Sequence, residues 1–421
     1  MKSFKLYFGC MLLAILTITC TSVTSKKQQK MESNAVKDTM KGSYGYDVAF
    51  MKSHNMNVVE LRDKQNKACL LISPELQGRV MTSSAKGNEG ASFGWINYKL
   101  IESGKVSGQF NPYGGEERLW FGPEGGPFSI YFQKGKEQVF ANWQVPAEID
   151  TKPFDIVAQT PESVNFQKRF TLANASGTNL EIGIERNVKL LTPAETEQTL
   201  QLSLDTSLDC VAYESENILT NKGNSAWTEK TGFLSIWLLS MFNPSEEGVV
   251  FIPFKKGSET DLGKIVTDDY FGKVPSDRLL VKDGVLFFKT DGKCRNKIGL
   301  SPERSLPYCG SYDPRNKVLT LLWFSKPEAP AKYVNSKWGT QDNPLSGDAI
   351  NSYNDGPVAD GSVMGPFYEI ESSSPAAMLG PGENITHKQR IFHISGDESQ
   401  LGVITEKLFH ISISDIKQAF Q

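Results

Sequence analysis

The stretch FYEIESSSPAAMLGPGENITHKQRIFHI, residues 367–394, decides how the rest of the chain is interpreted. In its first alternating run Glu369 and Glu371 stand two positions apart, and a Pro-Gly pair at 381–382 separates this run from a second one. Two alternating runs separated by a loop with such a turn indicate two β-strands. Because side chains alternate between the faces of a strand, both carboxylates point to the same face. That face is either solvated or part of a site.

Short alternating runs broken by Gly, Pro, Asn and Asp continue from about residue 47 to residue 394. In LEIGIERNVKLL, residues 180–191, apolar and polar residues alternate with the period of a half-buried strand. Many short strands with regular turns predict an all-β fold, a large antiparallel sandwich over 46–397. Leu401, Ile404, Leu408 and Ile411 instead recur at helical spacing, and Ser414 with Asp415 can cap a last short helix. We therefore expect a helical tail at 398–421 that packs on the sandwich.

The N-terminus indicates export. Lys2 and Lys5 precede the apolar run LYFGCMLLAILTIT, which is shorter than a membrane span, and Cys20 follows directly. This order resembles a bacterial lipoprotein signal. It predicts a signal peptide at 1–19, an acylated Cys20, a flexible tether at 20–45 and attachment to the bacterial membrane facing the periplasm, with surface exposure left open. The alternative is a simple signal peptide in which Cys20 has no role.

The overall composition narrows the choice of partners. The net charge is −3 with 22% charged residues, so neither nucleic acid nor an anionic membrane surface is an expected partner, and the membrane is reached only through the lipid anchor. We expect a monomer. Cysteines 69, 210, 294 and 309 form no CxxC pair, which excludes a zinc signature. Either Cys294 and Cys309 form a disulfide or all four thiols are free.

Three segments resemble one family. ISPELQGRVMTSSA (72–85), NPYGGEERLWFGPEGGPFSIYF (111–132) and the stretch at 367–394 are similar, in this order, to segments of the galactose-mutarotase-like (aldose 1-epimerase-like) supersandwich superfamily. The chain also resembles a group of Bacteroidetes lipoproteins with that fold. The resemblance covers about 47–394 and implies a sugar site in a concave cleft. It places Glu371 on the family's general base.

The histidines depart from this family. His54, His387, His393 and His410 all lie away from the family's catalytic histidine positions, and the matching position in ENILTNKGNSAW (216–227) is Lys222. A lysine with a pKa near 10.4 is a poor proton donor at neutral pH. We therefore predict carbohydrate binding without conventional epimerase activity. The alternative is an active aldose 1-epimerase, or another sugar-active enzyme such as a hydrolase or lyase, with Glu371 as base and a non-histidine acid such as Lys222 or protonated Glu369.

Sugar sites combine aromatic rings with planar polar groups. On this basis the predicted catalytic pair is Glu369 and Glu371. The predicted substrate-binding residues are Asn111, Arg118, Trp120, Glu124, Lys222, Trp227 and His387. Core packing is the alternative for the two tryptophans, a hydrogen-bonded strand histidine is the alternative for His387, and a solvated turn is the alternative for the run at 116–118.

A polar segment at 338–361 leads into the Glu369 strand and carries Trp338 and Tyr353, which we expect to cover a ligand. Its aspartates, at 342, 348, 355 and 360, offer oxygen ligands for Ca²⁺, but their spacing matches no EF-hand loop. A metal-free loop of Asx turns is favoured, and we expect no cofactor and no metal.

The lipid anchor is directly testable. We expect Cys20→Ala to abolish metabolic labelling with palmitate, because the thiol of Cys20 is the predicted acylation site. Cys10→Ala, within the same apolar run, is the control and should keep the label. Unchanged labelling of the Cys20 variant would exclude the lipoprotein interpretation.

Overall fold

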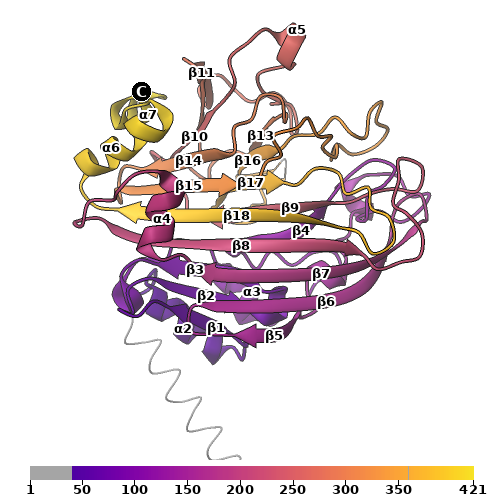
Figure 1. Cartoon of the computed structure of the whole chain (residues 1–421), viewed down its shortest axis with the longest axis horizontal. Coiled ribbons are helices and arrows are strands. Elements are labelled where there is room, and N and C mark those ends of the chain that lie inside the picture. The colour runs from indigo at the N-terminus through magenta and orange to yellow at the C-terminus, as the bar shows by residue number, and fades with distance from the viewer. Residues whose placement is uncertain (1–39, 359) are drawn as a thin grey trace, which may run out of the picture.

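Three antiparallel sheets form the body of the computed structural model, which describes residues 40–358 and 360–421 (Figure 1). The largest has ten strands, in the order β11 (Leu279–Lys282), β12 (Val285–Lys289), β10 (Val249–Pro253), β14 (Tyr308–Asp313), β15 (Val318–Phe324), β18 (Asn384–Ser395), β8 (Asp209–Asn221), β7 (Asn179–Leu190), β6 (Ser163–Ala173) and β5 (Asp155–Gln159). The second has five strands, β13 (Asn296–Leu300), β16 (Ile350–Asn354), β17 (Tyr368–Ser373), β9 (Ser235–Phe242) and β4 (Arg118–Gly122). The third contains β1 (Val59–Arg62), β2 (Cys69–Ser73) and β3 (Arg79–Ser84). The predicted large antiparallel sandwich is confirmed.

The ten-stranded and five-stranded sheets pack face to face, and the alternating apolar side chains of each meet between them. Ile184 on β7 and Leu219 on β8 belong to the same buried cluster as Leu238 on β9 and Ile370 on β17. Burial of this apolar surface is the main favourable contribution to the stability of such a sandwich. The strands predicted from period-2 alternation therefore have their apolar side chains where the pattern requires.

A polar layer crosses the same interface. Arg186 on β7 donates to Glu117 Oε1 at 2.7 Å and to Asn217 Oδ1 on β8 at 2.7 Å. Gln389 on β18 donates to Glu117 Oε2 at 2.8 Å and to Ser240 Oγ on β9 at 3.0 Å. All five side chains are buried. The run at 116–118, which the sequence left open as a solvated turn, is thus part of the interior.

Helices cover the periphery of the sheets. They are α2 (Tyr44–Ser53), α3 (Tyr98–Ser103), α4 (Pro193–Leu200), α5 (Glu259–Leu262), α6 (Glu398–Phe409) and α7 (Ile413–Gln418). Helices α6 and α7 form the predicted tail and lie beside β10 and β14 (Figure 1), where Leu401 and Ile404 join a buried cluster with Phe251. The cap of α7 differs from the expectation, because Ser412 and Asp415 form the capping box in place of Ser414 and Asp415.

Two further expectations meet the structure here. Residues 44 and 45, at the end of the predicted tether, already belong to α2, whereas Cys20 and the signal peptide lie outside the described residues. All four cysteines between 40 and 421 are free, so the Cys294–Cys309 disulfide does not form. Within the described ranges, none of the helices combines the length and apolar character needed to cross a bilayer.

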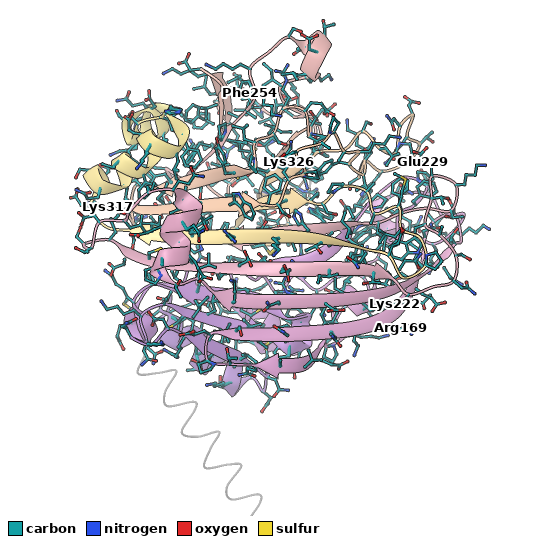
Figure 2. The ribbon with its side chains drawn as sticks, in the orientation of Figure 1. Arg169, Lys222, Glu229, Phe254, Lys317 and Lys326 are labelled. Carbon is teal, nitrogen blue, oxygen red and sulfur yellow. The ribbon has the colours of Figure 1, made fainter. Side chains whose placement is uncertain are left out.

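The buried ion pair allows a matched stability test. We expect Arg186→Ala to lower the free energy of unfolding by about 3–5 kcal/mol, because it leaves the Glu117 carboxylate buried without its charge partner. Arg169→Ala is the control, since Arg169 pairs with Glu181 at 3.0 Å on the exposed surface (Figure 2) and such pairs contribute under about 1 kcal/mol. Urea denaturation of both variants measures the difference, and equal small losses would contradict the role given to the buried pair.

Candidate functional site

The outer face of the five-stranded sheet concentrates charged and aromatic side chains. The strand register pairs Glu371 on β17 with Asn351 on β16 and with Leu239 on β9, and Leu239 pairs with Arg118 on β4. One step along, Glu369 pairs with Tyr353, which pairs with Lys297 on β13. Directly paired residues point to the same side of a sheet. We call the set Arg118, Trp120, Trp237, Lys297, Asn351, Tyr353, Glu369 and Glu371 the carboxylate face.

Glu371 is the most connected residue of this face. Its Oε2 accepts hydrogen bonds from Lys297 Nζ and from Trp237 Nε1, each at 2.8 Å. Burial disfavours the charged ammonium of Lys297, but the charge and hydrogen bond of Glu371 outweigh burial and raise the lysine pKa. Glu371 Oε1 is buried and has no hydrogen-bond partner among the described residues. One oxygen is thus held by the protein and the other is available to a ligand.

Glu369 has a different environment. Its Oε1 lies 3.6 Å from Arg118 NH2, which is beyond hydrogen-bonding distance, and it has no other partner in the described chain. Burial, followed by the negative charge of Glu371, raises the pKa of Glu369 to about 8. Burial therefore favours the protonated form of Glu369. Lys297 lies at hydrogen-bonding distance from Glu371, whereas the Arg118 guanidinium lies beyond that distance from Glu369 Oε1.

Arg118 connects the carboxyl groups to an aromatic wall. Its guanidinium lies 3.8 Å from the ring centre of Trp120, a cation–π contact, and its Nε and NH1 have no hydrogen-bond partner within 40–358 and 360–421. The ring of Trp120 lies 5.6 Å from that of Trp237 and 6.3 Å from that of Trp143. Aromatic surface and unsatisfied polar groups therefore meet at one place.

Two loop segments cover this face. Trp338, whose side chain is 36% exposed, packs on Phe132 and Trp143, and burial raises the pKa of the nearby Glu124 carboxyl. On the other side the hydroxyl of Tyr270 hydrogen-bonds the Asp348 carboxylate and accepts from Asn351 Nδ2 at 3.2 Å. Burial raises the pKa of Asp348 to about 6. The covering segments add titratable groups next to Lys297.

Five of the residues predicted from the sequence lie in this region. Glu369, Glu371, Arg118 and Trp120 belong to the carboxylate face, and Glu124 is close enough for its pKa to respond to Lys297 and Glu371. Trp338, which we expect to cover a ligand, packs on Trp143, whose ring lies near that of Trp120. Tyr353, expected on a loop, is instead a buried residue of β16.

Two predicted residues lie elsewhere because of the faces they occupy. Lys222 is exposed at the end of β8, where its carbonyl accepts a hydrogen bond from Arg169 at 3.2 Å (Figure 2). His387 is fully buried between the sheets, where Nε2 contacts Ser372 Oγ at 2.8 Å, and burial lowers its pKa to about 3. Ser372 and Glu371 are neighbours on one strand, so their side chains point to opposite faces. Neither Lys222 nor His387 reaches the carboxyl groups.

Trp227 and Asn111 have structural contacts instead. Trp227 is buried in the core, with its backbone N–H donating to the Leu379 carbonyl at 2.9 Å. Asn111 Nδ2 donates to Asp150 Oδ2 at 2.7 Å. The negative charge of Asp150 acts on Arg118. Asn111 is thus linked to the carboxylate face through Asp150 and does not belong to that face.

Sequence reasoning missed Lys297, Tyr270 and Trp237 as site residues. No sequence motif marks Lys297, and Tyr270 lies on a segment without regular secondary structure. Their proximity to Glu371 arises only when the chain folds. Trp237 sits in the apolar run FLSIWLLSMF, a pattern typical of a core residue. Among the described residues no group of three or more His, Cys, Asp or Glu is arranged to hold a metal ion. Asp355, considered as a calcium ligand, accepts a hydrogen bond from the Tyr353 hydroxyl at 2.7 Å.

Comparison with protein families finds a match over residues 42–420 to a family of unknown function, DUF6786. The chain belongs to DUF6786. Comparison with curated proteins finds no match. The DUF6786 chain is similar to several solved structures with low sequence identity, and these similarities concern the fold.

Three of these structures show how distant the similarity is. The Slr1438 protein from Synechocystis sp. PCC 6803 is 13% identical, with 81% of this chain and 96% of that chain covered and a TM-score of 0.49. A galactose mutarotase-like protein from Lactobacillus casei is 10% identical, with 80% and 100% covered and a TM-score of 0.47. A galactose mutarotase related enzyme from Lactobacillus acidophilus is 12% identical, with 80% and 97% covered and a TM-score of 0.45. The likeness to Bacteroidetes lipoproteins stays a prediction.

The raised pKa of Glu369 gives this DUF6786 protein a testable pH dependence. Folded Glu369 keeps its proton up to about pH 8, whereas an unfolded carboxyl releases it near 4.5, so unfolding between these values releases a proton. The contribution of Glu369 to stability is complete below that window and is lost as pH rises through it.

We therefore expect Glu369→Gln to remove a decline in stability between about pH 5 and 8, measured by urea unfolding against wild type. Glu229→Gln is the control, because Glu229 is exposed and contacts only Lys332 at the surface. If Glu369→Gln keeps the wild-type slope, Glu369 is ionised in the folded protein.

Proposed function

We propose that the protein binds a saccharide on the carboxylate face of its five-stranded sheet. One observation carries this proposal: buried hydrogen-bonding atoms without partners in the described chain gather among tryptophan rings. They are Glu369 Oε1, Glu371 Oε1, Arg118 Nε and NH1, and Trp120 Nε1. Buried polar groups are costly unless they are hydrogen-bonded, so a ligand that supplies both donors and acceptors is favoured here.

A sugar matches this set better than an apolar or a purely ionic ligand. Adjacent hydroxyl groups donate to Glu371 Oε1 and accept from Arg118, whose planar fork suits paired oxygens. The apolar C–H face of a pyranose ring packs on indole surfaces such as those of Trp120 and Trp237. Charges of both signs are present, so a neutral polyol is accommodated without an uncompensated charge.

Access to this face requires movement of its cover. The carboxyl groups of Glu369 and Glu371 are nearly inaccessible, and Trp338 is the partly exposed residue above Glu124. We infer that the segment carrying Trp338 moves outward to admit the ligand. This movement breaks the ring packing of Trp338 on Trp143 and the hydrogen bonds from Gly339 N–H to Gln138 Oε1 at 2.7 Å and from Glu124 N–H to Ser336 Oγ at 3.2 Å.

The location of this activity follows from the sequence. We propose that the protein is exported and held at the periplasmic side of the membrane by a lipid on Cys20. The described part of the chain begins at residue 40, beyond the anchor.

A second candidate function is proton transfer on the bound sugar, and the state of Glu369 favours it. Opening of a sugar ring needs a base for the anomeric hydroxyl and an acid for the ring oxygen. Glu371 is the candidate base, and Glu369, protonated up to about pH 8, is a non-histidine candidate acid. Aldose 1-epimerase activity, or the action of a hydrolase or lyase, would use the same pair.

Binding and catalysis are separable by experiment. We expect isothermal titration with a panel of monosaccharides, including D-glucose and D-galactose, to show binding that Glu371→Gln weakens by at least about tenfold, the size expected for a hydrogen bond to a charged group. Trp338→Ala, which removes part of the cover, should bind faster, and Glu229→Gln should bind as wild type does. No binding to any panel member, or full affinity in Glu371→Gln, would contradict the proposed site.

Polarimetry of glucose and galactose then tests the second candidate. A simple binding protein leaves the rate of mutarotation unchanged. Turnover of about 1 s⁻¹ or more, within the common range for enzymes, that is lost in Glu369→Gln would establish the acid–base function.

A further inference from the structure

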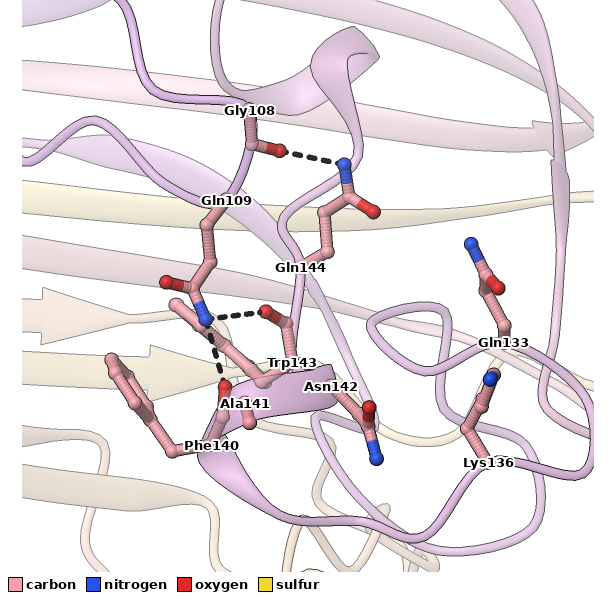
Figure 3. A pocket seen from close by; sticks show the side chains of 9 residues that line it. All are labelled: Gly108, Gln109, Gln133, Lys136, Phe140, Ala141, Asn142, Trp143 and Gln144. Atoms are coloured by element: carbon pink, nitrogen blue, oxygen red, sulfur yellow. Dashed lines mark hydrogen bonds between the residues drawn. The ribbon is translucent and has the colours of Figure 1, made fainter.

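A depression of about 650 Å³ lies outside the carboxylate face and has no role in the proposed function so far (Figure 3). It is formed by three short segments, at 108–109, 133–136 and 140–144. Its lining is unusually uniform in chemistry: side-chain amides predominate, with one lysine and two aromatic residues. The lining contains no carboxylate, so the depression is not suited to a cation.

Gln109 and Gln144 are held in place by hydrogen bonds to backbone carbonyls. Gln109 Nε2 donates to the carbonyls of Phe140 at 2.7 Å and Trp143 at 3.0 Å, and Gln144 Nε2 donates to the Gly108 carbonyl at 2.6 Å. In Figure 3 the oxygen of Gln144 points away from Gly108 and toward the side of the hollow where Gln133 lies. Fixed amides of this kind offer acceptors and donors to hydroxyl groups at a small cost in side-chain entropy.

Aromatic rings connect the depression to Glu371. Phe140, which is 65% exposed, is stacked on Trp143 at 6.0 Å and 17°. Trp143 contacts Trp120 at 6.3 Å, Trp120 contacts Trp237 at 5.6 Å, and Trp237 donates to Glu371 at 2.8 Å. Trp143 is therefore shared by the hollow and the aromatic wall of the site.

The cover of the site joins the same wall. The ring of Trp338 is stacked near that of Trp143, with ring centres 6.3 Å apart and an interplanar angle of 23°, and it also packs on Phe132 at 5.1 Å. Outward movement of Trp338 would open the way between the carboxyl groups and the depression along the ring of Trp143. Both ends of this path have the features that bind sugars, namely ring faces and planar polar groups.

We propose that the depression is a subsite for further sugar units of an oligosaccharide, one end of which lies at Glu371. This inference rests on the proposed function and names its ligand class as a glycan chain in place of a free monosaccharide. The volume of the depression is within the range of sites that hold small ligands. The depression is open to solvent, which suits a sugar chain that continues beyond it. Exposed Phe140 is the stacking platform, and Gln133 is an amide that contacts the sugar.

The test uses an array of immobilised oligosaccharides of two or more units together with the parent monosaccharides in solution. We expect the wild-type protein to bind at least one oligosaccharide about tenfold or more tightly than its monosaccharide. Phe140→Ala should remove about five- to tenfold of this gain, the value of one ring contact, and leave monosaccharide affinity unchanged. Gln133→Ala, at an exposed position, should reduce the gain without affecting folding.

Val157→Ala is the matched control, because it also removes an exposed apolar side chain but lies on edge strand β5. It should bind every probe as wild type does. If oligosaccharides bind no more tightly than monosaccharides, or if neither Phe140→Ala nor Gln133→Ala reduces the gain, the subsite is refuted while the proposed function stands. If no saccharide of either kind binds, both proposals fail. Loss in Phe140→Ala with full affinity in Glu371→Gln would refute the connection to the carboxylate face.

Discussion

The buried ion pair between Arg186 and Glu117 is the constraint on which the site depends. It joins β7 of the large sheet to the residue that precedes β4 of the small sheet, with the two side chains inaccessible to water. A charge in this position requires its partner, so the two sheets have one favourable alignment. The next residue, Arg118, points to the opposite face and reaches Glu369. The polar layer inside the sandwich and the carboxylate face outside are therefore two sides of the same strands.

The same alternation organises the central strand of the site. On β17, Ser372 points inward and contacts His387, while Glu371 points outward and binds Lys297 and Trp237. The outer side chains differ in their electrostatic surroundings. Glu371 has an ammonium group at 2.8 Å, and Glu369 has only a guanidinium at 3.6 Å, so burial dominates and raises its pKa. The two glutamates of β17 thus have different surroundings because Lys297 on β13 hydrogen-bonds Glu371.

The sequence could predict the parts of this site that obey local rules. Alternation placed Glu369 and Glu371 together, and the Gly-rich segment at 111–132 contains Arg118, Trp120 and Glu124, which all lie at or near the carboxylate face. The strand that contains His387 and the strand that ends just before Lys222 were predictable. The face of the sheet to which each of these side chains points was not. A shift of one residue along a strand reverses the side to which a side chain points, and no local pattern distinguished the inner from the outer face of two stacked sheets.

The sequence by itself determined the period-2 strands, the helical tail and the shared face of Glu369 and Glu371, because these depend on interactions between residues close in the chain. The tertiary structure decided which face of each sheet is interior, and it brought Lys297, Trp237 and Tyr270 to Glu371 from distant segments. It also raised the pKa of Glu369, because a pKa depends on burial and on neighbouring charges, and both are set by contacts between segments far apart in the sequence.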